Sequence, residues 1–116
     1  MSEGRLTQLS DLAAVERLLE SSAARPQLVF KHSAFCPLSS LALSELRSHL
    51  ESSPEGVDYW MVTVQTHRPV SDSVEERLAV RHETPQAILV RDGRAVWNAS
   101  HRRITEASLA EALAAR

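Results

Sequence analysis

The chain has 116 residues, of which 43% are hydrophobic and 24% charged, with a formal net charge of −2. We expect residues 1–116 to form a single globular domain with one core. The charge gives no electrostatic reason to expect nucleic acid or an anionic membrane as a partner, and no apolar run approaches the ~20 residues that span a bilayer. Cys36 is the one cysteine, and residues 1–5 lack the apolar core of a signal peptide. The expected location is therefore the reducing cytoplasm.

The first half of the chain alternates strand and helix patterns. Residues 5–9 carry a weak edge-strand pattern, and Ser10 is placed to cap a helix over 11–21. A continuous apolar run over 27–31 predicts a strand that is covered on both faces. A second helix begins at Pro37 and is broken at 52–56. The two helices have apolar residues at helical spacing: Leu12, Val15, Leu18 and Leu19 in the first, and Leu38, Leu41, Ala42, Leu46 and Leu50 in the second.

The second half predicts two more helices and a hairpin. Residues 57–64 form the strongest strand pattern, which we place centrally in the sheet. A helix follows over 70–81, then strands over 86–90 and 94–98 that Asp92-Gly93 joins as a tight turn. Thr105 is expected to cap a last helix with Leu109, Ala112 and Leu113 turned inward.

These elements give the order (β)αβαβαββα and an α/β fold. A right-handed crossover makes the strands at 27–31 and 57–64 parallel neighbours. The hairpin then adds antiparallel strands on the other side of the 27–31 strand. The prediction is a central mixed sheet with helices on both faces.

Cys36 lies where the 27–31 strand gives way to the second helix. Pro37 suits the first helical position, where its missing N–H costs nothing. Free N–H groups and the helix dipole favour an anion there, and thiols at such positions have pKa values of roughly 3.5–7.5. The alternative is a small buried hydrophobe without chemistry. The position favours a reactive thiol.

Thr84-Pro85 directly precedes a strand, where proline is tolerated because it need not donate to a ladder. A cis bond there would present the Thr84 backbone at the end of the sheet. The plainer interpretation is an ordinary strand-starting proline, because only about 5–6% of X–Pro bonds in folded proteins are cis.

The chain resembles the thioredoxin fold and, over nearly its whole length, the monothiol bacilliredoxin family, the YtxJ-type proteins of bacillithiol-using bacteria. The resemblance is carried by the lead-in Phe30-Lys31-His32-Ser33, by the site Cys36-Pro37-Leu38-Ser39 and, less specifically, by Thr84-Pro85. It implies a cis bond at Pro85 and a wall beside Cys36 that pairs with an extended substrate. Ala34-Phe35 departs from the usual family pattern, and Phe35 is expected to affect which partners fit.

The resemblance implies a monothiol exchange. The Cys36 thiolate attacks the small-thiol sulfur of a mixed disulfide on a client protein. Bacillithiol is then the co-substrate, S-bacillithiolated proteins are the clients, and no cofactor is tightly bound. A second thiol, from solution, from another bacilliredoxin or from a reductase, must regenerate Cys36.

Several side chains near Cys36 have two interpretations. Ser39 stands where a dithiol thioredoxin has its second cysteine; its hydroxyl either donates to the Cys36 thiolate or is a plain first-turn polar group. Lys31 and His32 either add positive charge near the thiol or point elsewhere.

Two other function classes remain open. One is a thioredoxin-like binding or adaptor module whose cysteine is idle. The other is an iron–sulfur protein similar to monothiol glutaredoxins, but their Gly-Phe-Ser continuation and glycine pair are missing, since the glycines are Gly4, Gly56 and Gly93. Five scattered histidines show no metal-ligand spacing, and we expect no metal.

Overall fold

The computed structural model describes residues 5–52 and 54–115. Residues 1–4, part of the signal-peptide argument, and Ser53, in the expected 52–56 break, lie outside that range. The elements follow the predicted order, with one added 3-10 helix: β1 (Leu6–Gln8), α1 (Leu12–Ser21), β2 (Gln27–His32), α2 (Pro37–Glu51), β3 (Asp58–Thr63), α3 (Arg68–Leu78), β4 (Gln86–Arg91), β5 (Arg94–Ser100), η2 (His101–Arg103) and α4 (Glu106–Ala114).

The five strands form one mixed sheet in the order β1-β3-β2-β4-β5. β2 runs parallel to β3 and antiparallel to β4, as predicted. The hairpin turn at Asp92 and Gly93 has φ values of 51° and 73°, the left-handed region that such tight turns require. The central placement of the 57–64 strand is corrected: β2 is the middle strand, and β3 lies between it and the short edge strand β1.

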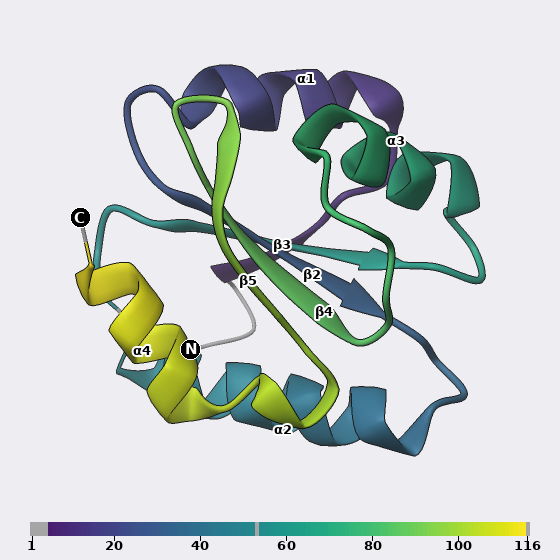
Figure 1. Cartoon of the computed structure of the whole chain (residues 1–116), viewed down its shortest axis with the longest axis vertical. Helices are drawn as coiled ribbons and strands as arrows, with labels where there is room; N and C mark the ends of the chain where they lie inside the picture. The colour runs from purple at the N-terminus through teal and green to yellow at the C-terminus, as the bar shows by residue number, and fades with distance from the viewer. Residues whose placement is uncertain (1–4, 53, 116) are drawn as a thin grey trace.

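Helices cover both faces of the sheet (Figure 1). α2 and α4 lie on one face, over a core that includes Leu28, Phe30 and Leu46. α1 and α3 lie on the other, over Val29, Val62 and Ile88. Alternate residues of a strand point to opposite faces, so the continuous apolar run of β2 supplies both cores. This confirms the α/β architecture.

The start of α1 differs from the prediction by one residue. The carboxylate Oδ1 of Asp11 accepts a hydrogen bond from the N–H of Ala14 at 2.7 Å, so Asp11 is the N-cap in place of Ser10. Leu12, the first residue of the helix, is 55% exposed, against the expectation that it faces the core. Asp and Ser cap helices about equally well. With two adjacent capping candidates, the sequence leaves the first residue of the helix undecided by one position.

The later helices also differ from the prediction in detail. On α2 the buried positions include Leu43 and His49, whereas Leu41 is 54% exposed. α3 begins two residues earlier than expected, at Arg68, and ends at Leu78 because Ala79 adopts a left-handed conformation. The predicted loop after β5 contains η2, while the cap at Thr105 is confirmed and forms a capping box with Ser108.

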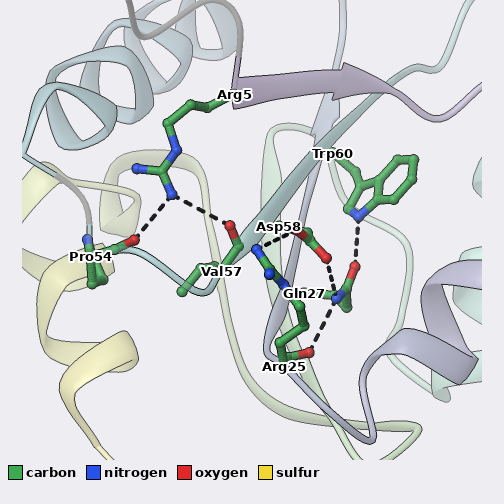
Figure 2. Close-up of polar contacts among 7 residues, drawn as sticks. All are labelled: Arg5, Arg25, Gln27, Pro54, Val57, Asp58 and Trp60. Carbon is green, nitrogen blue, oxygen red and sulfur yellow. Dashed lines mark hydrogen bonds and ion pairs between the residues drawn. The ribbon is translucent and has the colours of Figure 1, made fainter.

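A polar network joins the starts of β2 and β3 (Figure 2). The buried Gln27 donates to Asp58 at 2.8 Å and accepts from the indole N–H of Trp60 at 2.8 Å. Arg25 pairs with Asp58 at 2.8 Å. Arg5, from the segment before β1, donates to the carbonyls that precede β3. These contacts fasten the end of the sheet where the parallel strands begin.

Candidate active site

Cys36 is the N-cap residue of α2. Its φ and ψ are −108° and 119°, and Pro37 begins the helix as the sequence predicts. The Cys36 carbonyl accepts from the N–H groups of Ser39 and Ser40 at 3.0 and 3.1 Å. Its side chain makes no capping hydrogen bond and is half-buried. The thiol therefore lies at the positive end of a 15-residue helix, where an anion is favoured, and is not used to cap that helix.

Ser39 is fully buried, and its hydroxyl fastens the segment in front of Cys36. Ser39 Oγ accepts from the backbone N–H of Ser33 at 2.9 Å and lies 2.8 Å from Nδ1 of His32 in a hydrogen bond. The structure thus directs this hydroxyl to His32 and Ser33, whereas donation to the Cys36 thiolate was one of the two interpretations of the sequence. Burial lowers the pKa of His32, and Arg47 lowers it further, so the neutral imidazole is favoured in this contact.

Gln65, in the turn after β3, holds the same segment from outside. Its Oε1 accepts from the N–H of Ala34 at 3.0 Å, and its Nε2 donates to the Ser33 hydroxyl at 2.7 Å. Gln65 is not among the residues that the sequence predicts at the site. Gln65 lies 31 positions after Ala34 and 32 positions after Ser33, so no local sequence pattern reveals these two contacts.

The Thr84-Pro85 peptide bond is cis, and Pro85 is buried at the start of β4. Lys31 of β2 pairs with Gln86 of β4, so Pro85 reaches the sheet end at which β2 leads into the Cys36 loop. The carbonyl of Pro85 accepts from the N–H of His101 at 3.0 Å, which joins η2 to the same corner. The topology thus brings Cys36, Thr84-Pro85 and η2 to one end of the molecule.

Lys31 points to the opposite face of the sheet from His32. It is fully buried, and its Nζ lies 3.1 Å from Nδ1 of His82 in a hydrogen bond. Burial lowers the pKa of Lys31, and the carboxylates of Glu75 and Asp72 partly offset that effect. Lys31 thus lies on the α3 side of the sheet, whereas His32 contacts α2; an effect of Lys31 on the thiol remains a prediction.

Phe35 immediately precedes Cys36 and is 85% exposed. A bare aromatic ring beside a thiol provides an apolar contact for whatever approaches it. Within the described residues, no cluster of three or more His, Cys, Asp or Glu side chains could hold a metal ion, and no helix there is long and apolar enough to cross a membrane.

A cysteine at the start of α2, facing a corner that contains a cis-proline, on a sheet of this order, defines the thioredoxin-like class. Solved structures agree with this assignment. The chain matches a protein described as having a thioredoxin fold with a TM-score of 0.85 and 32% identity, over 96% of each chain. It matches Fasciola hepatica thioredoxin with a TM-score of 0.74 and 18% identity, over 93% of this chain and 96% of that one. For mitochondrial thioredoxin 3 of Saccharomyces cerevisiae the TM-score is 0.73 and the identity 14%, over 98% of each.

The sequence model of the monothiol bacilliredoxin family matches residues 7–109, which is most of the chain. The protein belongs to this family, and the resemblance recognised in the sequence is confirmed. Family and fold together support a thiol redox function.

Proposed function

We propose that the protein removes a low-molecular-weight thiol, bacillithiol in the first instance, from mixed disulfides on client proteins in the cytoplasm. Cys36 is the nucleophile. The observation that carries the proposal is the lone thiol at the N-terminus of α2, in the corner that also contains the cis Thr84-Pro85 bond.

The reaction is one thiol–disulfide exchange. The Cys36 thiolate attacks the small-thiol sulfur, the bond between that sulfur and the client sulfur breaks, and the client leaves as a thiolate that takes up a proton. A new disulfide joins Cys36 to the small thiol. One disulfide forms as one is lost, so the step needs no external oxidant or reductant.

The surrounding residues serve this step in distinct ways. Pro37 starts the helix directly after Cys36, so the thiolate lies at the positive end of the helix dipole. The Thr84 backbone pairs with the extended client, and the exposed ring of Phe35 contacts the client's apolar side chains. Ser39 and His32 hold the loop that carries Cys36 in place and so position the thiolate. Lys31, through its contact with His82, stabilises the same end of the sheet from the α3 side.

Release of the small thiol needs a second molecule. Position 39 holds a hydroxyl, which cannot exchange with a disulfide, and the sequence contains no other cysteine. A thiol from solution, another bacilliredoxin or a reductase therefore attacks the adduct on Cys36 and returns it to the thiolate.

The test mixes the reduced protein with a client carrying a bacillithiol mixed disulfide and follows both by intact mass. The expected result is an adduct of one bacillithiol on the wild type, an equal amount of free client, and no adduct on Cys36→Ala. A parallel reaction uses the glutathione mixed disulfide of the same client.

The outcomes separate the parts of the proposal. Equal transfer of glutathione would leave the exchange chemistry in place and remove bacillithiol as the preferred thiol. No transfer of either thiol from a client with an accessible disulfide would sink the exchange itself and favour a binding module with an idle cysteine.

A further inference from the structure

An open groove of about 510 Å³ lies beside the Cys36 corner. One wall is Leu38, in the first turn of α2 and two residues after Cys36; the other is η2 with the end of β5. A second hollow of about 260 Å³ shares Leu38, His101 and Arg102 and continues along α2. The groove therefore borders the first turn of α2, two residues after Cys36, which does not itself line the groove.

The segment that lines this groove is fixed to the site at both of its ends. The N–H of His101 donates to the carbonyl of Pro85 at 3.0 Å, and Ser100 pairs with Gln86 across the hairpin. On the other side of η2, Ile104 is 2% exposed and inserts into the core beneath α2 and α4. Residues 101–103 thus have a defined place relative to the cis-proline.

The side chains of this segment make the groove positive. Arg102 and Arg103 both line it, both are exposed, and within the described ranges neither has a side-chain ion pair. The one carboxylate in the lining of the groove itself is Glu83, which already accepts from the Ser100 hydroxyl at 3.0 Å and lies 3.9 Å from Nδ1 of His101. Glu45, in the adjoining hollow, accepts from the N–H of Glu106 at 2.7 Å. Two guanidinium groups are left to face a ligand.

We propose that this groove holds the carboxylate-bearing body of the small thiol while its sulfur is bonded to Cys36, with Arg102 and Arg103 binding the carboxylates. Guanidinium groups suit this task because their planar donors match a carboxylate. The inference rests on the proposed function and adds the substrate class: a small thiol with carboxylate groups is preferred over a neutral one.

The covalent geometry favours the small thiol over the client as occupant. In the proposed exchange Cys36 bonds to the small-thiol sulfur, so that molecule remains at the site after the client leaves. We place its body in the groove because Leu38, only two residues after Cys36, forms one wall of it. The client sulfur departs in the opposite direction along the breaking bond.

The test uses one client protein with a single thiol, prepared as its mixed disulfide with mercaptosuccinate, which has two carboxylates, or with 2-mercaptoethanol, which has none. The initial rate of transfer to Cys36 is measured by quenched intact mass. In the variant Arg102→Ala/Arg103→Ala the rate of transfer should fall about tenfold for the mercaptosuccinate disulfide, which is the effect of losing two exposed ion pairs. For the 2-mercaptoethanol disulfide the rate should fall less than about twofold. Salt at about 0.5 M should reduce the preference of the wild type for the mercaptosuccinate disulfide over the 2-mercaptoethanol disulfide.

A matched control removes the same net charge elsewhere. Arg17 of α1 and Arg94 at the hairpin turn are both exposed and line none of the grooves described above, so Arg17→Ala/Arg94→Ala should keep the preference. The reversed variant Arg102→Glu/Arg103→Glu should favour the neutral disulfide, and a urea unfolding curve shows whether each variant is folded.

Two results would overturn the inference while leaving the proposed function intact. In one, the arginine variants transfer both small thiols as fast as the wild type. In the other, the arginine variants transfer both small thiols more slowly than the wild type and by the same factor, which would assign the arginines to binding an acidic segment of the client. If the wild type transfers neither thiol, the proposed function fails and the inference fails with it.

Discussion

At position 39, where a dithiol redoxin has its second thiol, the hydroxyl has a structural task. Ser39 Oγ satisfies the N–H of Ser33 and the ring of His32, and it is fully buried. Gln65 meets the same segment from the solvent side. The four-residue segment before α2 is therefore held from two directions, which limits how far Cys36 can move.

Replacing Ser39 by Ala should lower the free energy of unfolding by about 1–2 kcal/mol, because a buried N–H and a partly buried ring nitrogen lose their partner. Urea unfolding measures this. Ser40→Ala is the matched control, since Ser40 is exposed on the same turn and its backbone bond to Cys36 is unchanged; it should stay within about 0.5 kcal/mol of wild type. Equal stability of the two variants would mean that the Ser39 contacts contribute nothing.

Among the elements, α1 offers a direct test of which residue caps it. Asp11 accepts from Ala14, and Ser10 does not occupy the cap. Asp11→Ala should cost about 1 kcal/mol of stability, the usual loss for a cap, whereas Ser10→Ala should be close to neutral. Chemical denaturation of the two variants decides the matter, and a larger loss from Ser10→Ala would reinstate the cap expected from the sequence.

The elements also show what local patterns can and cannot predict. The runs over 27–31 and 57–64 and the Asp92-Gly93 turn depend on neighbouring residues, and the structure confirms them. The inward placement of Leu12 and Leu41 is wrong because helical spacing shows which residues share a face, whereas contacts with the sheet and the neighbouring helices decide which of them are covered.

Contacts between distant segments lie outside any such pattern. Gln65 meets Ser33 and Ala34 only because β2 and β3 are parallel neighbours. The basic run His101-Arg102-Arg103, directly after the strand that pairs with Gln86, was visible in the sequence. Only the hydrogen bond from His101 to Pro85 places this run beside the Cys36 corner, and that contact joins distant residues.

For the whole molecule, three histidines make stability depend on pH. Burial lowers the pKa of each of three histidines: His32, His49 and His82. A nearby positive charge lowers the pKa further in each case: Arg47 for His32, Arg5 for His49, and Lys31 with Arg68 for His82. The unfolded chain, with pKa values near 6.5, then binds more protons than the folded one. Stability is therefore retained above about pH 6.5 and falls as the pH drops below it.

The expected loss is up to about 1.4 kcal/mol per pH unit for each additional proton that the unfolded chain binds. Urea midpoints of the reduced protein at pH 7.5 and 5.5 measure it. His49→Gln should flatten the dependence, because an amide can keep the contact with the Tyr59 hydroxyl, now 2.9 Å, without taking up a proton. An unchanged midpoint between the two pH values would show that burial of these rings does not disfavour their charged form.

The network at the start of β2 and β3 lies at the far end of the sheet from Cys36, and the end of α4 lies close to that same end (Figures 1 and 2). The carbonyl of Ala115 accepts from the Arg91 guanidinium at 3.2 Å, and Val90 beside it pairs with Gln27. A fluorescent reporter fused after α4 would thus be carried on the side away from the thiol. The fold is suited to a genetically encoded sensor in which the sensing cysteine stays accessible while the reporter is attached at the opposite pole.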